Sequence, residues 1–140
     1  MESKELRIGN YVKVWDEIYQ VNQVLPDSII HNYIFNDPSS GSEEIDNENV
    51  YPIPITEALL FDLGFTLAEE KEFIKRYVTR DSYGMDDFVL CYSKQENKYF
   101  FDFSSIKYFI NFAVFEYMHH LQNVYFALIN KELQFKKTSI

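Results

Sequence analysis

The first third of the chain alternates apolar and polar residues with the period of a β-strand. Three such runs, at 11–15, 18–25 and 29–35, are separated by the short turns Asp16-Glu17 and Pro26-Asp27-Ser28. Period-two alternation between tight turns is typical of antiparallel strands that bury one face. We therefore expect an N-terminal β-meander, in the manner of a small SH3-like barrel. A lone tryptophan near a turn usually lies at the edge of a core, and this is the expectation for the only tryptophan of the chain.

The next segment, NDPSSGSEEIDNEN at 36–49, is polar, acidic and rich in turn-forming residues. This composition predicts an exposed loop, which is the best candidate for an internal boundary. Its carboxylates fit a calcium-binding loop poorly, because Ser42 stands where such a loop requires glycine. We interpret 1–140 as a single domain with two possible subdomains, 1–54 and 55–140.

A short helix with clear start and stop signals follows the loop. Thr56 can cap its N-terminus, and Gly64 can adopt the left-handed conformation just after its end. Phe65 would then fold back on Leu60. The predicted apolar face consists of Leu59, Leu60 and Leu63.

The second half predicts a central antiparallel sheet and one long helix. Strands are expected at 72–79, 87–93, 98–103 and 106–112, although the last run can also begin a helix. Residues 114–130 place apolar side chains in one stripe at helical spacing, which is typical of a core-facing helix. The members of this stripe are Val114, Tyr117, Met118, Leu121, Tyr125 and Leu128. An edge strand is expected at 132–136. Together these strands and helices predict the fold class α+β.

The net charge of −9, from 22 acidic and 13 basic residues, argues against binding to phosphate backbones. Nucleic acids and anionic membranes are recognised by clustered Lys and Arg, whereas the basic residues here are scattered. Two alternatives stay open. The acidic surface could imitate DNA and occupy a DNA-binding host protein, or the N-terminal meander could bind nucleic acid despite the charge.

The chain starts with the charged stretch MESKELRIGN and has no apolar run of membrane-spanning length. Its single cysteine, Cys91, lies in the apolar run FVLCY and is expected to be a buried thiol. We therefore expect a cytoplasmic protein that does not contact membranes.

The predicted long helix carries a polar row opposite its apolar stripe. Its members are Glu116, His119, Asn123 and Phe126, flanked by His120 and Gln122. This row is our candidate partner-contact surface, with Phe126 supplying apolar area and the other three orientation. In the alternative that we favour, another layer, such as the meander, covers the row and buries Phe126.

The same row has little support as a catalytic or metal site. Glu116 and His119 have the i, i+3 spacing that lets two side chains approach one ion, but helix-bundle metal sites need ligands from several helices. His31 is the only other histidine besides His120, and it lies in the β region. We therefore assign no catalytic residue, no metal ligand and no cofactor, and expect no enzyme. A metal-dependent hydrolase remains the enzymatic alternative.

Three sequence blocks carry a resemblance to a known family. The blocks are ELRIGNYV, PIPITEALLFDLGF and HHLQNVYFALINKEL. They resemble a family of small uncharacterised proteins of Bacteroides-type bacteria and their phages and prophages. Its blocks read approximately LRIGNxV, PIPLTEexLLxxGF and HxLQNLYFALTGxEL. The family histidine aligns with His119, and its Gln-Asn pair aligns with Gln122 and Asn123.

The resemblance covers both ends and the middle of the chain and implies an α+β fold and a phage or mobile-element origin. The chain departs from the family at Ile129-Asn130, where the family tends to have Thr-Gly. Asparagine also tolerates the left-handed cap that glycine provides. The family implies no activity, so no catalytic residue is transferred. We expect a non-enzymatic phage or prophage accessory protein that acts through contacts with an unknown protein partner.

Overall fold

A computed structural model describes residues 1, 5–34, 37–80, 83–101 and 114–135 of the chain. The chain divides into two compact units. The first consists of Met1–Pro54 and Tyr117–Val124, and the second consists of Ile55–Glu116 and Tyr125–Ile140.

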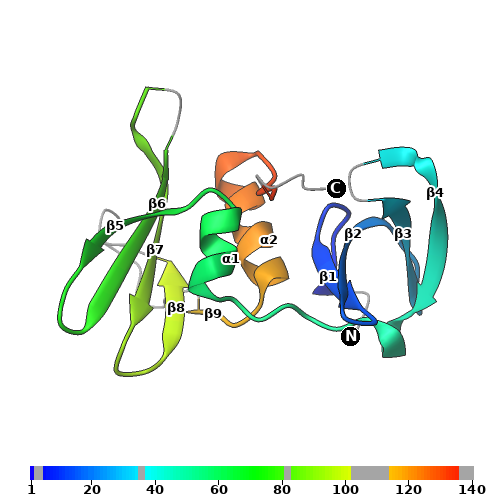
Figure 1. Cartoon of the computed structure of the whole chain (residues 1–140), viewed down its shortest axis with the longest axis horizontal. Coiled ribbons are helices and arrows are strands. Elements are labelled where there is room, and N and C mark those ends of the chain that lie inside the picture. Colours follow the sequence, from blue (N-terminus) through cyan, green and yellow to red (C-terminus); the bar gives the residue numbers. More distant parts are fainter. Residues whose placement is uncertain (2–4, 35–36, 81–82, 102–113, 136–140) are drawn as a thin grey trace. The chain divides into compact units, whose positions relative to one another are not determined.

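The first unit contains a four-stranded antiparallel sheet whose strands follow chain order (Figure 1). The strands are β1 (Tyr11–Val14), β2 (Glu17–Val24), β3 (Ser28–Ile34) and β4 (Asp37–Asp46). Each strand contributes buried apolar side chains to one core, among them Val12, Val21, Ile29 and Ile45. The first three strands begin and end within one residue of the predicted positions, so the meander is confirmed. The SH3-like detail stays a prediction.

The turn between β1 and β2 consists of Trp15 and Asp16, whose φ angles are 48° and 67°. Two central residues with positive φ define a type I′ turn, whose twist matches that of the flanking strands. Val14 pairs with Glu17 across the turn, so the turn lies one residue earlier than predicted. Trp15 is 65% exposed, and its expected place at the edge of the core is wrong.

The acidic segment 36–49 is not a loop over its described part. Residues Asp37–Asp46 form β4, which pairs antiparallel with β3, and Asn47–Asn49 form a short 3-10 helix. Ile45 lies opposite Ile29, and its side chain is buried. A strand at the edge of a sheet is held mainly by main-chain hydrogen bonds to its neighbour. Its composition can therefore be that of a loop.

The second unit contains a five-stranded antiparallel sheet, again in chain order (Figure 1). Its strands are β5 (Thr66–Glu70), β6 (Ile74–Arg80), β7 (Asp86–Ser93), β8 (Lys98–Phe101) and β9 (Val114–Phe115). Strands β6, β7 and β8 match predicted strands. The outer strands β5 and β9 were not predicted, because every residue of β5 is exposed and β9 has only two residues. The strand predicted at 106–112 lies outside the described residues.

Helix α1 (Glu57–Asp62) has the predicted caps. The Leu59 N–H donates to Thr56 Oγ1 at 3.2 Å. At the other end Gly64 has a φ of 94°, and the Phe65 N–H donates to the Leu60 carbonyl at 2.9 Å. A hydrogen bond from the residue after a left-handed glycine back to the last turn defines a Schellman motif. The short helix, its caps and the buried leucine face are confirmed.

Helix α1 packs on one face of the five-stranded sheet through aromatic contacts (Figure 1). The ring of Phe61 lies 6.3 Å from that of Tyr77, and Phe65 lies 6.2 Å from Phe88. Polar contacts join the same two elements. The Glu57 carboxylate accepts hydrogen bonds from the Tyr77 hydroxyl and from Lys75 Nζ. These hydrogen bonds, first that of Tyr77, hold the pKa of the Glu57 carboxyl below its ordinary value.

Helix α2 (Met118–Ile129) is shorter than predicted. Val114 and Phe115 belong to β9, and Tyr117 forms an isolated bridge with Pro54. The helix ends at Asn130, whose φ of 61° confirms that asparagine takes the left-handed cap. Residues 132–135 have no regular secondary structure, so the expected edge strand is wrong over its described part. The α+β class is confirmed.

Replacing Glu57 by glutamine should lower the stability in a pH-dependent manner. Because the folded-state pKa of Glu57 is lowered, the carboxylate stabilises the fold at neutral pH, and this contribution is lost as the pH falls through that pKa. The difference in free energy of unfolding between wild type and E57Q should therefore shrink on acidification, measured by urea titrations across a pH series. Glu72 is an exposed control without an ion pair among the described residues, so E72Q should show no such trend. A difference for E57Q that is constant with pH would contradict the assignment.

Candidate functional site

The central part of the predicted polar row belongs to the first unit. In this part, Gln122 and Asn123 contact the N-terminal segment of the chain. Gln122 is fully buried. Its side-chain carbonyl accepts a hydrogen bond from the Tyr11 backbone N–H at 2.8 Å, and its amide nitrogen donates to the Gly9 carbonyl at 3.1 Å. The Gln122 side chain thus makes the hydrogen bonds to the backbone that a neighbouring strand would make at the start of β1.

Asn123 extends this contact by one residue. Its Oδ1 accepts hydrogen bonds from Asn10 Nδ2 at 2.8 Å and from Arg7 Nε at 3.2 Å. Asn10 is itself fully buried, and its Oδ1 accepts from the Arg7 backbone N–H at 2.7 Å. Buried amides whose donors and acceptors are satisfied specify one arrangement of the groups around them.

The N-terminal side of this network is a tight turn from Arg7 to Asn10. The Asn10 N–H donates to the Arg7 carbonyl at 3.0 Å, and Gly9, the third residue of the turn, has a φ of 98°. This is the type II pattern, which needs glycine at that place. The turn presents the Gly9 carbonyl and the Tyr11 N–H to Gln122.

Two histidines and a glutamate gather at the start of α2. A nitrogen of His119, a nitrogen of His120 and a carboxylate oxygen of Glu5 all lie within 4.8 Å of one another. The two imidazole rings are 4.2 Å apart, and the Tyr117 ring stacks on that of His119 at 6.0 Å with an interplanar angle of 9°. Glu5 is exposed and His120 half-buried.

His119 is 1% exposed, and neither of its nitrogens has a hydrogen-bond partner among the described residues. Burial, together with the neighbouring His120, lowers its pKa to about 4, against the opposing effect of Glu5. The imidazole is therefore neutral at physiological pH and keeps a free lone pair.

The four residues proposed as a contact surface have separate fates. His119 is buried, and Asn123 is half-buried and hydrogen-bonds within the protein. Glu116 is exposed but precedes α2, and Phe126 is half-buried on the helix. An exposed position for the contact surface is wrong for His119, and the contact role of the other three residues stays a prediction. A buried helix face next to N-terminal residues agrees with the alternative in which another layer covers this row.

Glu5 lies outside the predicted polar row, and Gln122 only flanks it in the sequence. The predicted row offers only Glu116 and His119 as ligands, with His31 as a further histidine in the β region. His31 lies in β3, where its Nε2 is 3.9 Å from Glu43 Oε2, and it is not part of the group at α2. The carboxylate beside His119 comes from the N-terminal segment, at a sequence distance that no helical spacing reveals.

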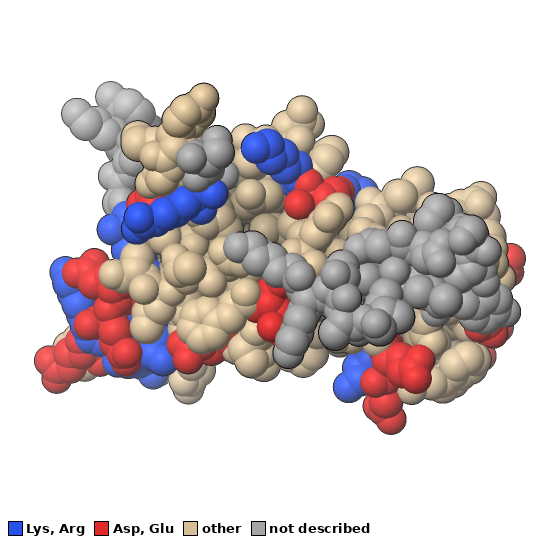
Figure 2. Space-filling view, turned by 45° about the horizontal axis from the view of Figure 1, so that its top comes forward, with Lys and Arg blue, Asp and Glu red and all other residues tan. Residues whose placement is uncertain are grey.

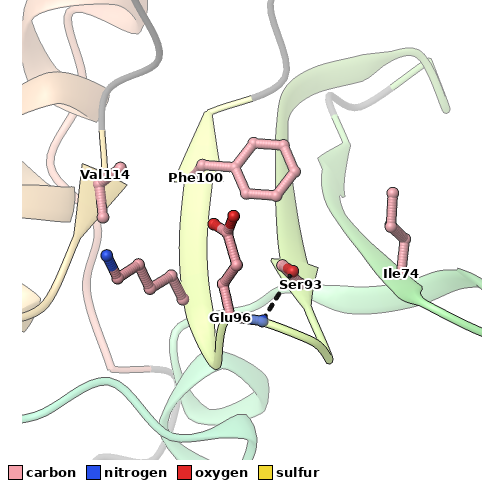
Figure 3. Close-up of a pocket in the computed structure, with 6 residues that line it drawn as sticks. Ile74, Ser93, Glu96, Phe100 and Val114 are labelled. Carbon is pink, nitrogen blue, oxygen red and sulfur yellow. Dashed lines mark hydrogen bonds between the residues drawn. The ribbon is translucent and has the colours of Figure 1, made fainter.

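A second candidate site is a pocket of about 320 Å³ on the five-stranded sheet of the second unit (Figure 3). Its lining residues are Ile74, Ser93, Glu96, Lys98, Phe100 and Val114. The pairs Ile74–Ser93, Ser93–Lys98 and Phe100–Val114 stand opposite each other in the sheet, so these side chains share one face. Tyr77, which contacts α1, points to the other face, because it lies an odd number of residues from Ile74 on β6.

Several acidic side chains of the second unit form ion pairs with basic ones. In the second unit the ion pairs Lys75–Glu57, Arg80–Asp86 and Lys94–Glu70 have N···O distances of 3.1, 3.3 and 2.7 Å. Figure 2 shows acidic groups next to basic ones on the face in view.

Comparisons with models of protein families, with curated proteins and with solved structures found no match to this chain. Among the described residues, no helix has the length and apolar character needed to cross a membrane.

Substitution of Gln122 by methionine should destabilise the protein by about 2 kcal/mol, because the buried Tyr11 N–H loses its acceptor. The Gly9 carbonyl keeps a second donor, Gln20 Nε2 at 3.1 Å, which limits the cost. Chemical denaturation measures the change.

The matched control is Gln95→Met at an exposed turn position, which should change the free energy of unfolding by less than about 0.5 kcal/mol. Equal effects of Q122M and Q95M would contradict the role of the buried amide.

Proposed function

We propose that the protein is a non-enzymatic accessory protein that binds another protein through the pocket of the second unit. The observation that carries this proposal is the pair of exposed aliphatic side chains in the pocket wall. Ile74 is 42% and Val114 is 48% exposed, and the half-buried ring of Phe100 lies between them (Figure 3). An apolar surface of this kind gains free energy when a partner covers it.

The polar groups of the pocket favour a protein partner over a small molecule. Ser93 Oγ already accepts a hydrogen bond from the Glu96 backbone N–H at 3.2 Å (Figure 3). The remaining charged residues, Glu96 and Lys98, are exposed. An apolar centre with charged groups around it is the arrangement found in protein interfaces. The expected occupant is an apolar side chain of a partner, flanked by residues that complement one acidic and one basic group.

The biological setting that we propose is a phage or prophage. The resemblance of the blocks ELRIGNYV, PIPITEALLFDLGF and HHLQNVYFALINKEL to the phage and prophage family supports it. A role through protein contacts is consistent with a family to which no activity is attached.

A photo-crosslinking residue at position 74 should capture one protein in host cells, and the same residue at position 128 should not. Leu128 is a suitable control because it is 56% exposed and lies outside the pocket. The captured protein, once purified, should bind the full chain in calorimetry. Ile74→Asp should weaken that binding at least about tenfold, because a charge would enter the apolar centre, whereas Leu128→Asp should leave it unchanged.

Both substitutions are at exposed positions and should leave the melting temperature nearly unchanged. Capture of a second copy of the chain alone, or equal binding by I74D and wild type, would contradict the proposal.

A further inference from the structure

The group at the start of α2 contains the donor atoms of a metal site and a physical reason to hold an ion. The donors are one nitrogen each from His119 and His120 and a carboxylate oxygen from Glu5, all within 4.8 Å of one another. Among the described residues both nitrogens of His119 lack a hydrogen-bond partner, although the side chain is 99% removed from solvent. A buried polar group without a partner costs free energy, so such a group in a native fold calls for an explanation.

We propose that Glu5, His119 and His120 together bind a divalent transition-metal ion of the zinc type. Two imidazole nitrogens and one carboxylate oxygen are the ligand set of open zinc sites, in which water occupies the fourth position. The hard ions Mg²⁺ and Ca²⁺ prefer oxygen ligands and fit this set poorly. The inference does not depend on the proposed protein contact, because the three ligands belong to the first unit and the pocket to the second.

The geometry requires a small closure around the ion. Tetrahedral ligands at 2.0–2.1 Å from zinc are about 3.3 Å apart, so donors within 4.8 Å need to approach by up to about 1.5 Å. Glu5 has an exposed side chain that can make this movement. His119 is fixed by burial and by stacking of the Tyr117 ring, and it can serve as the rigid member of the site.

The electrostatics of the three ligands support a cation. A metal ion binds the lone pair of a neutral imidazole nitrogen, and two such nitrogens are available in this group. Glu5 contributes the negative charge. The positive end of the α2 dipole opposes a cation at this place, but the effect of a helix dipole is small compared with coordination. Coordination bonds to two imidazoles outweigh it.

The test uses the full-length chain without a polyhistidine tag, stripped of metal with a chelator and dialysed. Titration with Co²⁺ should produce the visible absorption bands of a four-coordinate ion, and Zn²⁺ should displace them with one ion per chain in calorimetry. Glu5→Gln and His120→Ala should each weaken Zn²⁺ binding at least about tenfold. Glu116→Gln, at an exposed carboxylate outside the group, should bind like wild type.

Thermal unfolding separates loss of a ligand from loss of the fold. Without metal, E5Q should unfold cooperatively like wild type, and Zn²⁺ should raise the melting temperature of E5Q less than that of wild type and of E116Q. If H120A fails to fold, E5Q decides the question. The absence of a Co²⁺ spectrum and of Zn²⁺ heat with folded wild type would overturn the proposal, and so would Zn²⁺ binding by E5Q with wild-type affinity.

Discussion

The buried amide of Gln122 is the interaction on which the first unit depends. It satisfies the Tyr11 N–H and adds a donor to the Gly9 carbonyl, at a point where β1 begins and no strand is at hand. Asn123 adds hydrogen bonds to Arg7 and Asn10. Two consecutive amide side chains thus bind part of a helix to a turn more than 100 residues earlier. The sequence blocks ELRIGNYV and HHLQNVYFALINKEL, which lie at opposite ends of the chain, meet in this network.

The hydrogen bonds of Gln122 and Asn123 also fix where the neighbouring polar side chains of the helix lie. One turn before Gln122, His119 is buried in the same layer, where its nitrogens have no hydrogen-bond partner among the described residues. His120 and Glu5 complete a set of donors that no single element supplies. In the second unit, one face of the sheet packs on α1 and the pocket lies on the other face. The two candidate sites thus belong to different units. The first is a group of polar donor atoms, and the second is a partly exposed apolar surface.

The parts of the fold that depend on local chemistry follow from the sequence. Strands β1 to β3 have period-two alternation. Helix α1 is capped by Thr56 at its start and is followed by Gly64, which has a positive φ. Strand β4 has no such pattern, and its composition resembles that of a loop. Pairing with β3 holds it in the sheet, and this pairing cannot be deduced from the segment itself. The burial of His119 and Gln122 could not be predicted from helical periodicity, since it depends on residues 5–11.

Native-state hydrogen exchange of the Tyr11 amide tests the central claim most directly. If Gln122 accepts this hydrogen bond in solution, the Tyr11 N–H should exchange only through global opening of the first unit. Its protection should then equal that of the Val21 N–H, which donates to the Asn10 carbonyl at 2.8 Å within the same unit. Exchange of Tyr11 at the rate of an unprotected amide, with Val21 still protected, would contradict the account.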